Sequence, residues 1–334
     1  MDSMKARNVE TMKAIVYEKY GLPDVLQLKE VAKPAPKDDE VLVKVHAASV
    51  NDWDWGLLRG KPFVNRLMAG FPKPKKIKIP GCDIAGSVEA VGSKVKRLKA
   101  GDEVFGDISR CHFGGFAEYV CAREEALTLK PAGMTFDEAA ALPQAGILAL
   151  QGLRHKGHIQ PGQKVLINGA GGGAGTFAIQ IAKSLGLHVT AVDSTIKLEK
   201  MRSLGAEHVI DYTEEDFTKN GQHYDLIIDM MGFHPFFDYR RSLSPKGRYV
   251  LVGGSSRLCN EVVFLGPWFS MTGSKKMGLL LHKANKELED LIALFEAGKV
   301  KPVIDRRYPL SEVPEAMRHF GSGKVVGKLV ITVA

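Results

Sequence analysis

The sequence contains no long apolar run. No stretch of its 334 residues approaches the roughly 18 to 20 uncharged apolar residues of a helix that spans a membrane. The first residues, MDSMKARNVETMK, also lack the hydrophobic segment that directs secretion. We therefore expect a cytoplasmic protein with no membrane partner.

Cysteine is scarce. The four cysteines, Cys82, Cys111, Cys121 and Cys259, lie far apart, and no two of them form a CxxC pair. Disulfide frameworks and structural zinc clusters depend on regularly spaced cysteines. The pattern argues against both.

Acidic residues are outnumbered, and the formal net charge is +8. The densest basic groups, at 73–78 and 94–99, have none of the interleaved aromatic residues that are typical of nucleic-acid-binding surfaces. We interpret the excess as a solvated basic surface and expect no nucleic-acid partner. A positive potential would also attract an anionic cofactor or substrate.

The length of the chain exceeds the usual size of one domain and predicts two. Short strand-like runs between residues 13 and 121, separated by Gly, Pro and Asp, predict a compact β domain, a barrel. Residues 51–79 form a longer irregular stretch within it. Residues 1–11 are polar and are interpreted as a flexible tail.

The clearest motif is VLINGAGGGAG at 165–175. Its first three residues are the apolar run of a buried parallel strand, and the residues after the glycines have the 3.6-residue period of a helix. A strand, a glycine-rich turn and a helix open a dinucleotide-binding unit, in which the diphosphate lies over the helix N-terminus. The turn has Ala170 in place of the first glycine of GxGxxG, so a glycine-rich turn of another α/β fold is the alternative.

A second strand-like run, 188–192, ends at Asp193, where such folds bind the adenosine ribose. Asp193 would accept hydrogen bonds from the ribose hydroxyls and would favour NAD(H). Ser194, Thr195 and Lys197 follow at once and offer the hydroxyl donors and the cation that a 2′-phosphate needs. These residues alone leave NAD(H) and NADP(H) both open.

Many short motifs, in order, resemble the medium-chain dehydrogenase/reductase superfamily, and within it the zinc-free quinone oxidoreductase-like branch. They are AASVND (47–52), PGCDIAG (80–86), VGSKVKRLKAGDEVFG (91–106), GGFAEYV (114–120), AALPQAGILAL (140–150), PGQKVLINGAGGGAG (161–175) and SLGAEHVIDY (203–212).

The resemblance implies an α/β protein with a discontinuous GroES-like β-barrel domain and a Rossmann domain with a doubly wound parallel sheet. It places the GroES-like domain at 12–145, the NAD(P)-binding domain at 146–282 and a return segment that completes the first domain at 283–334, with the active site between the domains. The expected cofactor contacts are Ala170, Gly172, Gly173, Ala174, Gly175, Asp193, Ser194, Thr195, Lys197, Tyr212, Val252, Gly253 and Gly254. Because reductases of this branch commonly use NADPH, we favour NADP(H) slightly over NAD(H).

The resemblance also bears on zinc. Zinc-dependent relatives hold catalytic zinc with Cys, His and Cys at the positions of Asn51, Cys82 and Ala145. A catalytic zinc needs three protein ligands of the Cys, His or carboxylate type, and these residues supply one. Asp83 would add an oxygen, and the site would still be poor. We therefore expect no metal.

Without zinc, an alcohol lacks the Lewis acid that would lower its pKa, so the expected reaction is hydride transfer from NAD(P)H to a quinone or an α,β-unsaturated carbonyl. By resemblance, Asn51 would bind the acceptor oxygen or the nicotinamide ribose; alternatively, it satisfies loop backbone. Trp53, Trp55 and Cys82 would line the substrate pocket or only fill space. A homodimer is plausible by analogy. The alternative functions are a metal-free NAD(P)-dependent alcohol or aldehyde oxidoreductase and a non-catalytic nucleotide-binding protein.

Overall fold

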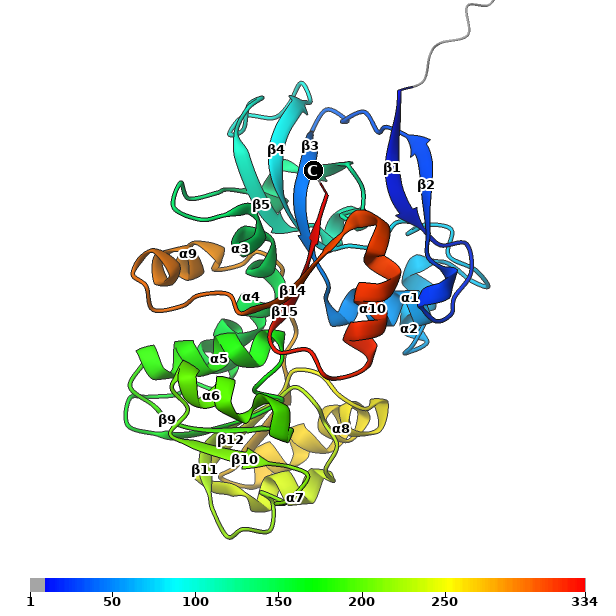
Figure 1. Ribbon diagram of the computed structural model, residues 1–334. Helices are drawn as coiled ribbons and strands as arrows, with labels where there is room; N and C mark the ends of the chain where they lie inside the picture. Colours follow the sequence, from blue (N-terminus) through cyan, green and yellow to red (C-terminus); the bar gives the residue numbers. More distant parts are fainter. Residues whose placement is uncertain (1–9, 334) are drawn as a thin grey trace, which may run out of the picture. The chain divides into compact units, whose positions relative to one another are not determined.

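The chain forms one antiparallel and one parallel main sheet, each lying mainly in its own unit (Figure 1). The computed structural model describes residues 10–333. The first unit comprises residues 1–140, 307–321 and 329–334, and the second comprises 141–306 and 322–328. The expected boundary at 283 falls inside the second unit. The expected tail at 1–11 lies outside the described residues up to residue 9, and a strand begins at Thr11.

In the first unit, β1 (Thr11–Val16) pairs antiparallel with β2 (Gln27–Ala32). The larger sheet has seven strands in the order β14-β15-β3-β4-β5-β7, with β6 also on β3. Its strands are β3 (Glu40–Ser49), β4 (Asp83–Val91), β5 (Glu103–Asp107), β6 (Tyr119–Arg123), β7 (Thr128–Leu129), β14 (Ile304–Pro309) and β15 (Lys328–Thr332). In β3, Val43 and Val45 are buried and Lys44 between them is exposed, but Val41, Leu42 and the last three residues of the strand are all buried, so inward and outward residues alternate only in its middle.

Helices also occur in the stretch that was predicted to be irregular. They are α1 (Asp52–Arg59) and α2 (Val64–Ala69); the other helices assigned mainly to this unit are α3 (Phe136–Ala141) and α10 (Val313–Gly321). A capping box starts α1, in which Asn51 and Asp54 each satisfy the other's backbone N–H. Gly60, with φ of +60°, ends it. Tryptophan and glycine within so short a helix hide its period in the sequence.

The second unit contains a six-stranded parallel sheet in the order β10-β9-β8-β11-β12-β13. The strands are β8 (Lys164–Asn168), β9 (His188–Asp193), β10 (His208–Asp211), β11 (Tyr224–Asp229), β12 (Leu243–Leu251) and β13 (Lys276–Leu279). The helices are α4 (Pro143–Gln151), α5 (Gly173–Ser184), α6 (Leu198–Leu204), α7 (Phe236–Arg241), α8 (Ser256–Thr272) and α9 (Leu288–Glu296).

This strand order is that of a doubly wound nucleotide-binding sheet. The chain adds strands in one direction from β8 to β10 and in the other direction from β11 to β13, so the order reverses between β8 and β11. Ligands of such sheets bind at the carboxyl ends of the strands, at this reversal. Val165, Leu166 and Ile167 of β8 are fully buried, as their apolar run predicts. Within residues 10–333, no helix is both long enough and apolar enough to cross a membrane.

Candidate active site

The glycine-rich turn leads from β8 into α5. Gly169 has φ of +82°, and Gly172 caps α5. A Cβ on Gly175 would lie 2.3 Å from the carbonyl oxygen of Gly169 and 2.5 Å from Cα of Ala170, so only glycine fits. The first N–H groups of a helix have no intrahelical acceptor and attract anions. The predicted strand, turn and helix are confirmed.

Asp193 lies at the end of β9, folded against the glycine turn. Its Oδ2 accepts a hydrogen bond from the N–H of Gly171 at 2.9 Å, and its Oδ1 accepts one from the N–H of Ser194 at 2.8 Å. The ammonium of Lys197 lies 3.2 Å from Oδ1, and both residues are 7% exposed. The cation therefore neutralises the carboxylate beside the turn, on the side where a ribose would bind.

A second carboxylate lies beside this one. Asp211, at the end of β10, is aligned with Asp193 in the register of the two strands. The hydroxyls of Thr195 and Thr213 both donate to it, and with a backbone N–H they hold the pKa of Asp211 below its usual range. Thr195 is thus hydrogen-bonded within the protein, whereas the ring of Tyr212 is exposed.

Two polar residues that sequence reasoning missed join the strands at the reversal. Asn168 ends β8, and its amide donates to the buried carboxylate of Asp229, which ends β11. Asp229 also accepts the hydroxyl of Tyr249 and the N–H groups of Met231 and Gly232. The sequence contained an indication of this pair, because Asn168 and Asp229 are each the polar residue that ends a buried apolar strand.

The predicted cofactor contacts Val252, Gly253 and Gly254 directly follow β12. The N–H of Val252 donates to the carbonyl of Asp229 at 2.7 Å. A Cβ on Gly254, which has φ of +142°, would lie 2.7 Å from Cα of Gly232. The two turns after β11 and β12 are therefore in close contact, and glycine is required where they meet.

The return segment also reaches the glycine turn. The N–H of Gly327 donates to the carbonyl of Gly171 at 2.9 Å, and Gly327 forms a parallel bridge with Gly172. The buried side chain of Lys328 passes over Gly173, where a Cβ would lie 2.9 Å from its Cδ. No local pattern in the sequence indicates this contact.

In the first unit, Asn51 and Cys82 lie together in a buried polar corner. The amide nitrogen of Asn51 lies 3.0 Å from Asp83 Oδ2, 3.3 Å from Cys82 Sγ and 3.4 Å from the carbonyl of Ser49. Its backbone N–H donates to Asp54 Oδ2, whose Oδ1 accepts the N–H of Gly81. The amide hydrogens of Asn51 thus face acceptors of the protein itself.

This corner has one more potential metal ligand than the sequence indicated. Ligand atoms of Cys82, Asp83 and Asp107 all lie within 4.8 Å of one another, and all three residues are buried. Asp107 ends β5 and is directly paired with Asp83 on β4. The amide of Asn51, however, points hydrogens at two of the three groups. A donor in that place does not fit a cation bound between Cys82 and Asp83.

The two predicted pocket tryptophans differ in their surroundings. Trp55 packs edge-on against Phe320 and lies under the guanidinium of Arg59, which indicates a packing role. Trp53 is partly exposed and stacks on Phe113, whose ring packs in one apolar cluster with Cys82. Trp53, which stacks on a member of the Cys82 cluster, is the more exposed of the two.

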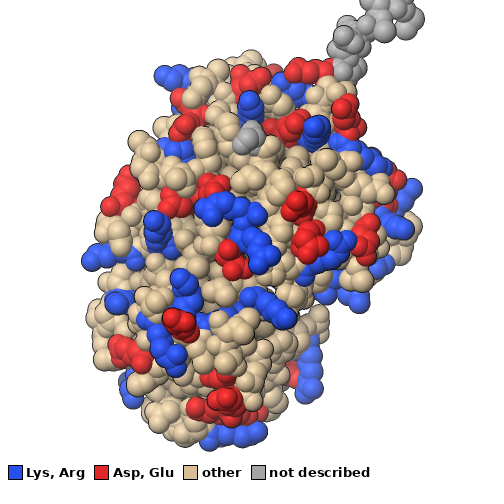
Figure 2. Space-filling view, in the orientation of Figure 1, with Lys and Arg blue, Asp and Glu red and all other residues tan. Residues whose placement is uncertain are grey.

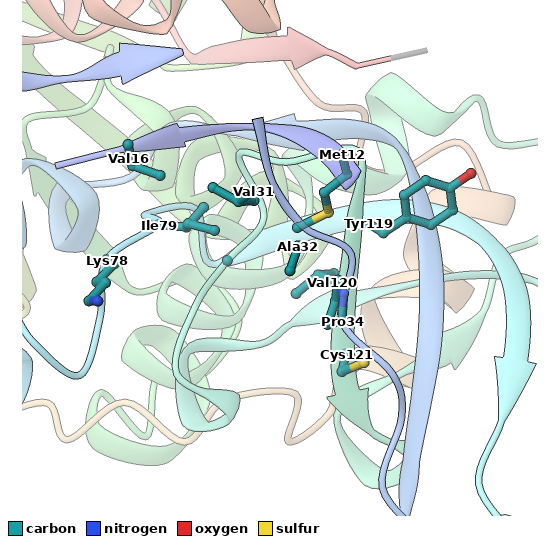
Figure 3. Close-up of a pocket in the computed structure, with 11 residues that line it drawn as sticks. Met12, Val16, Val31, Ala32, Pro34, Lys78, Ile79, Tyr119, Val120 and Cys121 are labelled. Carbon is teal, nitrogen blue, oxygen red and sulfur yellow. The ribbon is translucent and has the colours of Figure 1, made fainter. Parts of the chain in front are cut away.

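A cavity of about 470 Å³ in the first unit contains none of the predicted site residues (Figure 3). It is lined by Met12, Val16, Val31, Ala32, Pro34, Lys78, Ile79, Gly114, Tyr119, Val120 and Cys121. The hydroxyl of Tyr119 points away from the other labelled side chains, and burial raises the pKa of Cys121 to about 12. The thiol of Cys121 is therefore a poor nucleophile for a ligand in this cavity.

Comparison with known proteins decides the family. Residues 37–132 match the alcohol dehydrogenase GroES-like domain, residues 204–331 match the zinc-binding dehydrogenase family, and residues 148–231 match the C-terminal domain of alanine dehydrogenase/PNT. The 2-methylene-furan-3-one reductase of Solanum lycopersicum is 38% identical over 96% of this chain and 79% of its own. The chain belongs to the medium-chain dehydrogenase/reductase superfamily, in its quinone oxidoreductase-like branch.

Two further relatives agree with this membership. The NADPH-dependent alkenal/one oxidoreductase of Arabidopsis thaliana is 35% identical over 96% of this chain and 79% of its own. The structure of the quinone oxidoreductase from Coxiella burnetii has a TM-score of 0.88 at 33% identity, covering 97% of this chain and all of the other. This protein is thus an oxidoreductase of the NAD(P)H-dependent quinone and alkenal reductase family, with the predicted GroES-like and Rossmann folds.

Proposed function

We propose that this protein transfers hydride from NAD(P)H to a quinone or an α,β-unsaturated carbonyl without the help of zinc. The observation that carries the proposal is the amide of Asn51, which donates to Cys82 and Asp83 in the corner where zinc-dependent relatives hold their metal. An amide donor in that corner supplies no Lewis acid. The names of the relatives support the same class of substrate.

The chemistry suits such acceptors. NAD(P)H, when bound, would supply the hydride that such an acceptor takes at carbon, at the quinone ring or at the β-carbon of the enone. The electron pair of the acceptor's π system moves to its oxygen, and a proton from solvent completes the product. Because the conjugated acceptor spreads the charge by itself, the protein needs only to orient it and to exclude competing reactions.

Residues of this chain would hold the reactants. The free N–H groups at the start of α5 would bind the diphosphate, and the Asp229 network would keep the turns beside it in place. The accessible face of Trp53 suits a planar acceptor. Asn51 is proposed to position the polar corner formed by Cys82 and Asp83.

NADP(H) remains our proposed cofactor. The ammonium of Lys197 neutralises Asp193, which lowers the repulsion that a 2′-phosphate would otherwise meet, and the hydroxyl of Ser194 lies beside the pair. The Arabidopsis relative is named as NADPH-dependent.

A homodimer through the edge strand β13 is a further proposal, which the molar mass in solution tests.

The decisive experiment follows the oxidation of NADPH against a panel of quinones, enones and aldehydes, and the reduction of NADP⁺ by alcohols. Each is measured before and after treatment with a chelator, together with metal analysis of the pure protein. We expect turnover of quinones or enones that survives chelation. Alcohol turnover that requires one tightly held zinc per chain would overturn the proposal, and tight NADPH binding without any turnover would favour a non-catalytic role.

A further inference from the structure

One segment of the chain carries a large local excess of positive charge. Between Trp55 and Cys82 the chain has seven Lys and Arg residues and no Asp or Glu, against a net charge of +8 for the whole protein. Four of the seven are lysines at 73–78. Lys73, Lys75 and Lys76 are exposed, and Figure 2 shows Lys and Arg side chains along the right-hand edge, where α2 lies in Figure 1.

The same segment exposes large apolar side chains. On α2 and the residues flanking it, these are Phe63, Val64, Leu67, Met68 and Phe71, which are between 37% and 60% exposed. The rings of Phe63 and Phe71 are in edge contact, with centroids 6.0 Å apart. Contiguous exposed apolar groups of this size mark sites of interaction.

The lysines and the apolar groups belong to one surface. After Gly70 the chain turns back on α2, and the N–H groups of Lys75 and Lys76 both donate to the carbonyl of Ala69, the last residue of that helix. Arg66, on α2 itself, donates to the carbonyl of Gly60 and lies over the ring of Tyr20. The basic groups therefore border the exposed apolar groups, and we refer to residues 61–76 as the basic apolar surface.

We propose that the basic apolar surface docks on an anionic lipid bilayer, with Phe63, Leu67 and Phe71 entering the headgroup boundary and Lys73, Lys75 and Lys76 facing anionic headgroups. Aromatic and aliphatic side chains beside lysines are the combination that binds such interfaces. A nucleic acid would satisfy the lysines, but it would leave the aliphatic groups Val64, Leu67 and Met68 without a suitable environment.

This proposal departs from the sequence-based expectation of a solvated basic surface without a membrane partner. The expectation of a solvated surface rested on the absence of aromatics within 73–78, and the expectation of no membrane partner rested on the absence of a long apolar run. In the structure, the backbone of Lys75 and Lys76 is hydrogen-bonded to the end of α2, and Phe71, which follows that helix, contacts Phe63. Aromatic and basic groups therefore share a surface, although they do not alternate in the sequence.

The test is sedimentation of the intact protein with vesicles of phosphatidylcholine alone and of equal parts phosphatidylcholine and phosphatidylglycerol. We expect binding to the anionic vesicles only. Each lysine near an anionic surface contributes roughly fivefold to partitioning, so K73E/K75E/K76E, which also adds three negative charges, should bind more than about a hundredfold more weakly. The matched control, K94E/K96E/K99E, changes the net charge equally at exposed lysines elsewhere in the first unit and should bind almost as well as the wild type.

A second pair of variants separates a bilayer from any other polyanion. F63S/F71S should lose most of its vesicle binding, whereas V91S/L129S, which removes two exposed apolar groups elsewhere, should not. The proposal is overturned if the two lysine triples behave alike, or if F63S/F71S binds like the wild type, because a purely electrostatic surface would then accept any polyanion. The assay has no turnover step, so its failure leaves the proposed reductase activity untouched.

Discussion

The side-chain amide of Asn168 donates to the carboxylate of Asp229 over 2.8 Å and so joins the ends of β8 and β11 across the reversal of the parallel sheet. Tyr249 of β12 donates to the other carboxylate oxygen over 2.7 Å. One buried acid therefore connects three neighbouring strands at the edge where the cofactor is expected. Its charge is offset by side-chain and backbone donors together.

Asp229→Ala should destabilise the protein by roughly 3 to 5 kcal/mol, because it leaves the buried donors Asn168 and Tyr249 without their acceptor. Urea denaturation measures the loss. Asp225→Ala, at the other end of the same strand, removes only an acceptor for the N–H of Lys164 and should cost about 1 kcal/mol or less. Equal losses in the two variants would refute a special role for Asp229.

Gly175→Ala should weaken NADPH binding strongly and lower stability. Its methyl group would meet the backbone of Gly169 and Ala170 at 2.3 and 2.5 Å, and backbone cannot move aside as a side chain can. This cost exceeds the gain of up to about 1 kcal/mol that alanine offers within a helix. Fluorescence titration and thermal unfolding report the two effects. At Gly133 a Cβ would meet nothing within 4 Å, so Gly133→Ala should leave both unchanged.

Asp193→Ala should raise the affinity for NADPH relative to NADH. The substitution removes a carboxylate that suits ribose hydroxyls, and it releases Lys197 from its ion pair to face a 2′-phosphate. Dissociation constants for both dinucleotides test the change. Lys197→Ala should shift the ratio in the opposite direction. A ratio that stays constant in both variants would remove this pair from the cofactor site.

Local features of the site were predictable from sequence, and contacts between distant segments were not. The glycine turn is recognisable in the sequence because close backbone approach needs glycine. Asp193 is recognisable because it follows at the spacing that a helix and a strand impose. The contact of Gly327 with Gly171 joins residues far apart in the chain, and nothing near either one indicates it. The discontinuous first domain was anticipated from family resemblance, since periodicity alone does not reveal it.

The polar corner shows the same limit. Asn51 and Cys82 were singled out by resemblance, but Asp107 became visible only once β4 and β5 were paired in register. The helix α1 was missed because a capping box and tertiary packing stabilise it more than its short apolar pattern does.

His46 should make stability depend on pH. Burial, and then the charge of Lys44, lowers the pKa of His46 below its ordinary value of 6.5 in the folded protein. Because the unfolded chain binds the proton more readily, this contribution to stability is present above that pH and is lost as the pH falls through the lower, folded value. His46→Gln removes the titration, so its urea midpoint should fall less than that of the wild type between about pH 7.5 and pH 5.5. Parallel curves for the two proteins would contradict the assignment.

Asn51→Ala should lower kcat for an enone or quinone by about tenfold or more while changing the dissociation constant for NADPH little. The variant removes the amide that orders Cys82 and Asp83 and that forms half of the capping box of α1. Loss of the cap costs about 1 kcal/mol of stability, which thermal unfolding separates from the kinetic effect.

Asn51→Asp keeps a capping oxygen but places a carboxylate beside Asp83. The two buried carboxylates then repel each other, so neither the stability of the protein nor the activity should recover. The variant should bind added Zn²⁺ more tightly than the wild type does, because the new carboxylate would add a ligand where the amide donates hydrogens. Wild-type turnover by the alanine variant would show that the corner has no part in the reaction.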